Sequence, residues 1–454
     1  MRIFAEHALL PCGWAADVLV TIGTDGRIVT VATGPSDAAD KRVATLAPAV
    51  SNLHSHTFQR AMAGLTERRG PAGQSDSFWT WRELMYRFLN VLTPDEIEAV
   101  ASFAFLEMLE AGYAAVAEFH YLHHAPGGVS YADLAELSGR IAHAAGKTGI
   151  GLTLLPVHYR RGGLDERPLA GGQLRFGNDL ERFGSLLDGA RRHLASLEAD
   201  ARLGLAPHSL RGVGEDDIRA LGALLPDAPI HIHIAEQEAE VEAIVTSTGQ
   251  RPVDWLLHHF DVDDRWCLIH ATHMTQDEIA RVARSGAIVG LCPVTEANLG
   301  DGIFPGADFA AAGGRFGIGT DSNVRISLAE ELRQIEYSQR LGRKARAVLA
   351  QPGGSVGRFA YTQALEGGAQ ALGRDAGRIE AGAFADLVSF APNETSDLPR
   401  GDALLDAWIF ARNGIRVADV WSAGRHVVSD GRHFARDEIA PVYQGVLRSV
   451  LSRL

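Results

Sequence analysis

Short apolar runs of strand length recur through the middle of the chain, and most of them end in polar residues. Longer segments lie between the runs, and several have the polar and apolar spacing of a helix. One begins at residues 93–96, a Thr-Pro-Asp-Glu sequence typical of a helix N-terminus, and continues through 97–109. The eight runs are residues 45–50, 114–119, 150–157, 202–206, 230–234, 266–269, 287–291 and 315–318.

This alternation of strands and helices predicts an α/β fold with a parallel sheet, because each helix returns the chain to the same edge. Eight such units predict a closed (β/α)8 barrel of the TIM type. The alternative is an open, doubly wound sheet. It is less favoured because no glycine-rich phosphate-binding loop follows the first run.

The two ends of the chain carry a different, strand-rich pattern. Near the start, runs at 17–22 and 27–31 flank the turn-rich residues 23–26, which predicts a β-hairpin. Strand-like runs return near the other end of the chain. They are residues 385–390, 417–421 and 424–431.

Neither of these end segments is large enough to form a core alone. We therefore expect one small β-sandwich domain built from residues 1–45 and 376–454 together. The barrel domain, residues 46–375, would be inserted between the two parts. This hypothesis requires strands from the two ends to lie close together, and a structure that separates them would exclude it.

Length and composition narrow the class of protein. A chain of 454 residues, 46% hydrophobic and 22% charged, is typical of a globular protein with one large domain and an attachment, or with two or three smaller ones. The net charge of -13 and the scattered Lys and Arg argue against a nucleic-acid partner. An anionic small-molecule substrate remains compatible, because local arginines can bind it.

Cysteine usage and targeting signals suggest a compartment. The three cysteines, Cys12, Cys267 and Cys292, form neither a disulfide framework nor a C-x-x-C metal motif. No stretch approaches the roughly 20 apolar residues that span a bilayer, and residues 1–14 do not resemble a signal peptide. We therefore expect a cytoplasmic protein of enzyme size without a membrane partner; a scaffold of this size is the alternative.

The first candidate for chemistry is the pair His54 and His56, directly after the first run. Side chains two residues apart on an extended strand point the same way, so the two imidazoles are spaced to bind one metal ion. A single H-x-H is short, however, and two unrelated polar residues at a strand exit would look the same. The other strand ends decide between these interpretations.

Polar residues follow most of the later runs as well, and in a barrel all of these positions meet at one end. Together they indicate a metal site much more specifically than any single histidine does. His54, His56, His233 and Asp321 make an N3O ligand set that suits Zn(II), with Fe(II) or Mn(II) as alternatives. The other candidates at the strand ends are Glu118, Tyr121, His208, Arg211, His231, Glu236 and His270.

Three of these residues lie next to the predicted ligands and have competing interpretations. His231 is either a neighbour that supports the metal site or a plain core residue, and the core is favoured. Glu236 can transfer protons without binding metal, or it can be a carboxylate at a helix N-terminus. His270 can orient the attacking water or stabilise developing charge, or it can be a structural histidine.

The residues now resemble the amidohydrolase superfamily: H-x-H after the first strand, His at the fifth and sixth, and Asp at the eighth. The H-x-x-E form of 233–236 is similar to the deaminase branch of that superfamily. No metal-bridging lysine ends the fourth run, which favours a single metal. Residues 382–388 look like the family's return strand, so the resemblance covers essentially the whole chain.

A closer resemblance is to the formimidoylglutamate deiminase family. It is carried by residues 52–64, 78–82 and 231–237 and is weaker elsewhere. That family hydrolyses the C=N bond of N-formimino-L-glutamate in histidine degradation, giving N-formyl-L-glutamate and ammonia. The resemblance implies a hydrolase with one divalent metal ion, for which the N3O ligand set favours zinc, and a homodimer.

The chemistry of the residues agrees with that reaction. Asp321 would take a proton from the attacking water, Glu236 would protonate the imine nitrogen, and His270 would steady the tetrahedral intermediate. Arginine is the natural partner of a carboxylate, so Arg82 and Arg211 are expected to hold the two substrate carboxylates. The alternative for either arginine is a surface ion pair. The resemblance implies that Gln59, Tyr121 and His208 supply further contacts to the substrate.

Two further hypotheses stay open at this point. The loop 68–75 would be a mobile lid or merely a connection. A deaminase of the same superfamily acting on a purine, pterin or triazine ring is the nearest rival function; it would need aromatic stacking and fewer arginines. A non-catalytic metal-binding scaffold is the rival from another class, but it would lack a catalytic group that is present here.

Overall fold

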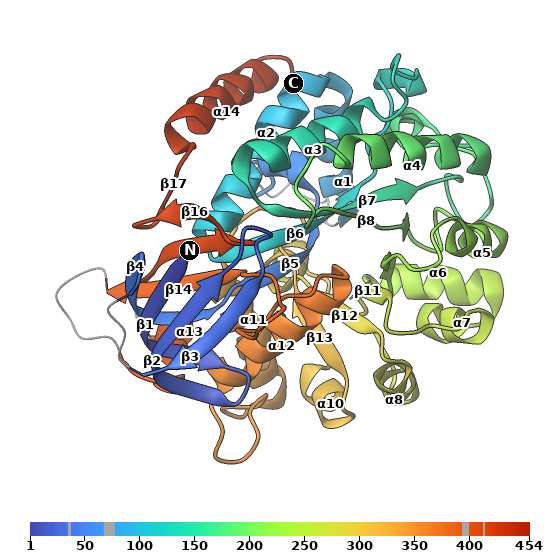
Figure 1. Ribbon diagram of the computed structural model, residues 1–454. Coiled ribbons are helices and arrows are strands. Elements are labelled where there is room, and N and C mark those ends of the chain that lie inside the picture. The colour runs from blue at the N-terminus through green and yellow to red at the C-terminus, as the bar shows by residue number, and fades with distance from the viewer. Residues whose placement is uncertain (35–37, 68–77, 393–398, 412–413) are drawn as a thin grey trace.

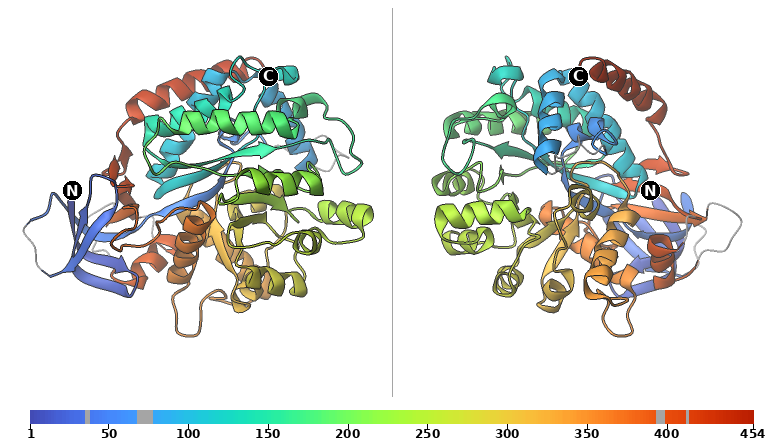
Figure 2. Two further views of the ribbon diagram at one scale, coloured as in Figure 1. Left: turned by 45° about the vertical axis from the view of Figure 1, so that its right-hand side comes forward. Right: turned by 180° about the vertical axis from the view of Figure 1, so that it is seen from behind.

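The structure is a computed structural model that describes residues 1–34, 38–67, 78–392, 399–411 and 414–454. It is an α/β fold in which parallel strands are surrounded by helices, with a second, mostly antiparallel sheet at one side (Figures 1 and 2). The α/β class and the parallel strands predicted from the sequence are confirmed.

The parallel strands form two hydrogen-bonded groups. One has the order β5-β6-β7-β8, with β9 also beside β7, and the other has the order β10-β11-β12-β13. Parallel bridges between Leu205 and Ile230 and between Ser55 and Asp321 connect the groups on both sides, so the strand order returns to β5. The strands are β5 (Val50–Ser55), β6 (Tyr113–His120), β7 (Gly151–His158), β8 (Arg202–Leu203), β9 (Ala206–Pro207), β10 (Ile230–Ile234), β11 (Trp266–His270), β12 (Ile288–Leu291) and β13 (Arg315–Ile318).

Helices follow most of these strands and cover their outer face (Figure 1). The predicted N-terminal signal at 93–96 is confirmed as a capping box, in which the Glu96 N–H donates to Thr93 Oγ1 and the Thr93 N–H donates to Glu96 Oε2. The helices are α1 (Phe78–Val91), α2 (Pro94–Glu110), α3 (Glu136–Thr148), α4 (Leu180–Leu194), α5 (Glu215–Leu224), α6 (Glu238–Thr248), α7 (Pro252–His259), α8 (Gln276–Ser285), α9 (Pro293–Leu299), α10 (Gly306–Ala311), α11 (Leu328–Arg343), α12 (Val356–Ala371), α13 (Asp402–Phe410) and α14 (Arg436–Leu451).

The second sheet contains strands from both chain ends, in the order β17-β16-β15-β14-β4-β1-β2-β3. The predicted pairing of the ends is confirmed, because β4 and β14 are antiparallel neighbours with Thr45 opposite Phe390. The predicted hairpin is also confirmed as β2 and β3. The strands are β1 (Arg2–Leu10), β2 (Gly13–Ile22), β3 (Ile28–Thr33), β4 (Lys41–Pro48), β14 (Leu387–Pro392), β15 (Ile415–Ser422), β16 (Arg425–Ser429) and β17 (Arg432–His433).

The first apolar run, residues 45–50, does not form the single strand that the sequence predicts. The run 45–50 spans two sheets, because β4 ends at Pro48 in the end sheet and β5 begins at Val50 among the parallel strands. The chain thus passes between the sheets with only Ala49 between the strands. Every residue from Thr45 to Ser55 is buried, so the apolar pattern gave no sign of the change.

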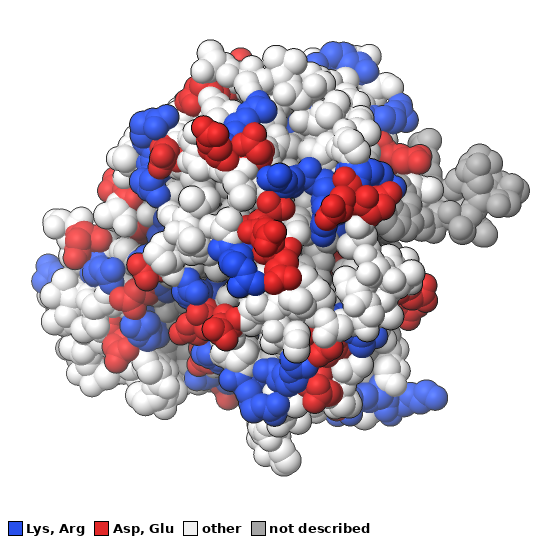
Figure 3. Space-filling view, turned by 90° about the vertical axis from the view of Figure 1, so that its right-hand side faces the viewer, with Lys and Arg blue, Asp and Glu red and all other residues white. Residues whose placement is uncertain are grey.

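The charged side chains of the surface are mixed in sign on the face that Figure 3 shows. The described residues of that face form no broad area of positive charge. Among the described residues, no helix has both the length and the apolar character needed to cross a bilayer.

Candidate metal centre and active site

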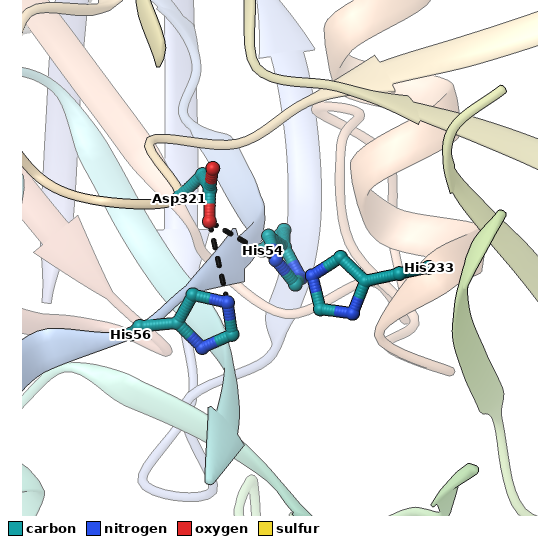
Figure 4. Close-up of side chains that lie close together, drawn as sticks. All are labelled: His54, His56, His233 and Asp321. Carbon is teal, nitrogen blue, oxygen red and sulfur yellow. Dashed lines mark ion pairs between the residues drawn. The ribbon is translucent and has the colours of Figure 1, made fainter. Parts of the chain in front are cut away.

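Four buried side chains from distant parts of the chain meet at the carboxyl ends of the parallel strands (Figure 4). His54 is on β5 and His56 follows it, His233 is on β10, and Asp321 lies in the turn after β13. One ligand atom from each lies within 4.8 Å of the others. Oδ1 of Asp321 lies 3.4 Å from Nε2 of His54 and 3.2 Å from Nε2 of His56. The four could therefore hold one metal ion.

Hydrogen bonds orient two of the three imidazoles. Nδ1 of His56 lies 2.9 Å from the carbonyl oxygen of Phe119, and Nδ1 of His233 lies 3.1 Å from that of His208. A carbonyl can only accept, so each Nδ1 carries the proton and each Nε2 keeps its lone pair. Among the described residues, neither ring nitrogen of the fully buried His54 has a hydrogen-bond partner. An unpaired buried nitrogen is costly, and a cation ligand would satisfy it.

The protonation states also fit a cation. Burial lowers the pKa of His54 and His233 well below the usual value, and the neighbouring histidines lower it further. Burial lowers the pKa of His56 too, although Asp321 acts in the opposite direction. The three imidazoles are therefore neutral at neutral pH, as a metal ligand must be. Three nitrogens and one carboxylate oxygen suit a divalent ion such as zinc.

Amide and hydroxyl side chains join β5 to the turn after β13. Asn52 Nδ2 donates to Thr320 Oγ1 at 2.7 Å, and Thr320 Oγ1 in turn donates to Asn323 Oδ1 at 2.7 Å. Asn323 Nδ2 lies within hydrogen-bonding distance of Ser55 Oγ, at 3.1 Å, and of the carbonyl oxygen of His56, at 3.2 Å. This buried network fixes the relative positions of ligands that are far apart in sequence.

Backbone conformations at the strand ends are unusual for residues other than glycine. Ala235 has φ 51°, His270 has φ 68° and Asp321 has φ 43°. The left-handed region costs such residues of order 1–3 kcal/mol, and it occurs most often where side chains must be aimed for function. Here it turns the chain at the last residue of β11, directly after β10 and in the turn that follows β13.

Glu236 and His270 lie beside the four ligands. Nε2 of His270 is 3.8 Å from Oε1 of Glu236, and its Nδ1 is 3.2 Å from Oε1 of the buried Glu296. Burial alone would lower the pKa of His270, but the charge of Glu236 and the hydrogen bond to Glu296 raise it to about 10. Burial raises the pKa of Glu236 above the usual value. A buried carboxyl and an imidazolium therefore face each other next to the ligands, which is suitable for proton transfer.

The two predicted arginines lie in the same cavity, which has a volume of about 600 Å³. Arg211 is shared between two carboxylates, 3.7 Å from Glu236 and 3.6 Å from Glu240. The guanidinium of Arg82 lies 5.7 Å from the ring centre of Tyr86. The other predicted residues that line the cavity are His56, Gln59, Tyr121, His208, His233, Glu236, His270 and Asp321.

The remaining sequence candidates are placed as follows. His231 is a core residue, as favoured, because its Nε2 is 2.8 Å from the carbonyl oxygen of Ala371 on α12. His54 lies behind the cavity wall, fully buried. The loop 68–75, considered as a lid, lies outside the described residues.

Several cavity residues were missed by sequence reasoning. They come from α1, α6, α9 and the segment after β7, and no motif surrounds them. The spacing from Glu236 to Glu240, one helical turn, was the only signal that could have suggested one of them. They are Met85, Tyr86, Tyr159, Gln173, Phe176 and Glu240, with Glu296 behind His270.

Three buried imidazoles and a carboxylate at the ends of parallel strands, with a proton-transferring pair beside them, define a hydrolytic metalloenzyme. The chain belongs to the amidohydrolase family, which matches residues 45–427. Residues 1–44 match the formimidoylglutamate deiminase HutF, N-terminal domain.

Full-length relatives agree with this membership. A formimidoylglutamate deiminase of Pseudomonas aeruginosa is 50% identical over 99% of both chains. The crystal structure of an amidohydrolase from Brucella melitensis is 51% identical, covers 99% of both chains and has a TM-score of 0.95. An adenosine deaminase from Xanthomonas campestris with bound zinc shares the fold, with a TM-score of 0.81 at 23% identity over 99% of this chain and 98% of the other.

Proposed function

We propose that the protein hydrolyses N-formimino-L-glutamate to N-formyl-L-glutamate and ammonia, a step of histidine degradation. The observation that carries the proposal is one cavity in which Glu236 and two arginines lie beside the N3O ligand set. Full-length identity of 50% to a formimidoylglutamate deiminase supports the same substrate.

His54, His56, His233 and Asp321 would hold one divalent ion, and zinc fits the three nitrogens and one oxygen best. When bound, such an ion lowers the pKa of a water molecule so that it can attack at neutral pH. The neighbouring residues then manage the protons.

The proton steps follow from the side chains next to the ligands. Asp321 accepts a proton as water adds to the formimino carbon, and Glu236 donates one to the terminal imine nitrogen. The resulting amine then takes up the proton held on Asp321, so that it leaves as ammonia when its C–N bond breaks. The remaining hydroxyl proton passes to Glu236 as the formyl C=O forms, so both carboxyl groups return to their starting states. The positively charged His270, 3.8 Å from Glu236, stabilises the oxygen on which negative charge develops.

The two arginines of the cavity would bind the negatively charged groups of the substrate. Arg82 and Arg211 would bind the carboxylates, with Gln59, Tyr121 and His208 as further polar contacts along the cavity. Arg211 already lies between two carboxylates, so a substrate carboxylate would compete with Glu236 for it. This arrangement favours a diacid over the purine, pterin or triazine rings of the rival function.

The same proposal includes the division into domains, the oligomeric state and the cellular compartment. Residues 46–375 would form a (β/α)8 barrel, supported by the strand order that returns to β5. Residues 1–45 and 376–454 would form the β-sandwich domain, supported by the shared sheet. The family resemblance supports a homodimer, and three free cysteines support a reducing cytoplasm.

The proposal is tested by measuring ammonia release from N-formimino-L-glutamate, with guanine and S-adenosylhomocysteine as comparison substrates. We expect turnover of the first substrate alone. We also expect Glu236→Gln to reduce kcat by roughly 10²- to 10⁴-fold, because the amide cannot transfer a proton. Metal analysis of the variant should show the ion retained, since Glu236 is not a ligand. Near-normal turnover in Glu236→Gln would remove this residue from the mechanism, and turnover of guanine alone would favour the rival function.

A further inference from the structure

One wall of the cavity is built from three tyrosines around a single buried phenylalanine, Phe176. The ring centre of Phe176 lies 4.9 Å from that of Tyr121, 5.6 Å from that of Tyr159 and 6.3 Å from that of Tyr86. The three tyrosines come from the end of β6, the end of β7 and helix α1, and all of them line the cavity. The wall is therefore assembled from three separate elements.

The three hydroxyls differ in how they are used. Tyr121 accepts a hydrogen bond from Gln59 Nε2 at 2.9 Å and donates to Met85 Sδ at 3.3 Å. Tyr159 accepts from Gln173 Nε2 at 3.2 Å but donates to no group in the described part of the chain. The Tyr86 hydroxyl likewise has no hydrogen bond to the residues that the structure describes. Two phenol protons therefore remain available at this wall.

Both of these hydroxyls belong to rings next to the proposed carboxylate anchors. A Cβ on Gly212, which follows Arg211, would lie only 3.3 Å from Cε2 of Tyr159 and 3.4 Å from its Cζ. Gly212 thus allows the Tyr159 ring to approach the backbone beside Arg211. The guanidinium of Arg82 lies 5.7 Å from the ring centre of Tyr86. Burial raises the pKa of Tyr86, so this phenol keeps its proton at neutral pH.

The imidazole of His208 lies between Tyr159 and the predicted metal ligand His233. The ring centre of His233 lies 5.2 Å from that of His208, which in turn lies 4.6 Å from that of Tyr159. A hydroxyl at this place would meet the tail of a substrate, because the reacting carbon must lie at the ligands themselves.

We propose that Tyr86 and Tyr159 are specificity-determining residues that donate hydrogen bonds to the substrate carboxylates, Tyr86 to the one held by Arg82 and Tyr159 to the one held by Arg211. This inference rests on the proposed function for the identity of the diacid. The two phenols make the site selective, because an analogue without the carboxylate leaves desolvated donors without partners. The ring contacts with Phe176 and the bond from Gln173 hold Tyr159 in place for this role.

The test compares Tyr159→Phe and Tyr86→Phe with the wild-type protein. We expect each variant to raise KM for N-formimino-L-glutamate roughly tenfold, since a hydrogen bond to a charged group is lost, and to leave kcat within about twofold. Tyr113→Phe is the matched control: Tyr113 is fully buried on β6, outside the cavity, and its hydroxyl has no partner among the described residues. Its kinetics should not change.

Two substrate analogues separate a specific contact from a structural effect. N-formimino-4-aminobutyrate lacks the α-carboxylate, and N-formimino-2-aminobutyrate lacks the side-chain carboxylate. Each Phe variant should match the wild type on the analogue that lacks its carboxylate. An unchanged KM for the diacid, or an equal loss on all three substrates, would overturn the inference.

Calorimetric binding of N-formyl-L-glutamate distinguishes this inference from the proposed function. If the wild type releases no ammonia but binds this dicarboxylate tenfold more tightly than Tyr159→Phe does, the proposed function fails and the inference stands. If ammonia is released but neither variant weakens binding, the inference alone fails. If the wild type neither turns over the substrate nor binds the dicarboxylate, both are overturned.

Discussion

At the scale of single residues, the metal centre depends on side chains that do not touch the metal. The ligands come from β5, β10 and the turn after β13. These three elements are far apart in the sequence. Asn323 holds two of them together, because its Nδ2 bonds the carbonyl oxygens of His56 and Asp321 at 3.2 and 3.1 Å. Such supporting groups orient the ligands and tune the affinity for the ion.

We therefore predict that Asn323→Ala weakens metal retention by about 10- to 100-fold, the usual effect of losing a supporting group. Dialysis against graded chelator concentrations, followed by metal analysis, measures this. Gln339→Ala is a matched control, since Gln339 is a buried amide that bonds the carbonyl oxygen of Phe304 at 2.8 Å, outside the cavity. Equal metal retention in the two variants would contradict the role of Asn323.

At the scale of elements, one carboxylate connects four strands of the end sheet. Asp419 on β15 lies 2.7 Å from Lys41 Nζ of β4, 2.8 Å from Ser389 Oγ of β14 and 2.9 Å from His426 Nε2 of β16. Burial alone would raise the pKa of Asp419, but these three hydrogen bonds lower it to about 2. The ionised form is therefore the one that stabilises the sheet.

Asp419→Asn should lower the free energy of unfolding by about 1–3 kcal/mol at neutral pH, because charged hydrogen bonds are lost. A depressed pKa in the folded state stabilises the protein above the unfolded pKa, near 3.9, and this contribution is lost as the pH falls towards about 2. Urea unfolding at neutral pH and below about pH 4 should show the difference between variant and wild type shrinking in acid. A difference that stays constant with pH would argue against the ionised carboxylate.

Most strands were predictable because their apolar runs are short and regularly spaced along the chain. The pairing of the chain ends was predictable because both ends carry strand-rich segments that are too small to form a core alone. The site was predictable where histidines and carboxylates close a strand, as at His233 and Asp321. Tyr86 and Tyr159 escaped prediction because a tyrosine after an apolar stretch looks like an ordinary core residue. The helices α13 and α14 also escaped, since they lie in a segment that the pattern indicated as strands.

At the scale of the whole molecule, a buried ion-pair network attaches the end sheet to the parallel strands. Arg374 follows α12 and bonds Asp386, which precedes β14, at 2.6 and 2.9 Å. It also contacts Asp200, before β8, at 2.9 Å, and Asp200 is bound by Arg425 of β16 at 2.8 and 2.9 Å. The side chains of Arg374, Asp200 and Asp386 are all at most 4% exposed.

Removing the guanidinium of Arg374 should therefore weaken the attachment of the end sheet to the parallel strands. We predict that Arg374→Met destabilises the protein by about 3–5 kcal/mol in urea unfolding, because the fully buried Asp386 loses its guanidinium. Arg425→Met should cost less, since Arg425 is 29% exposed and Asp200 keeps Arg374. Adding Asp386→Asn to Arg374→Met should recover part of the loss, because no unpaired buried charge then remains at that position. A double variant less stable than Arg374→Met would show that shape, and not charge, holds the end sheet in place.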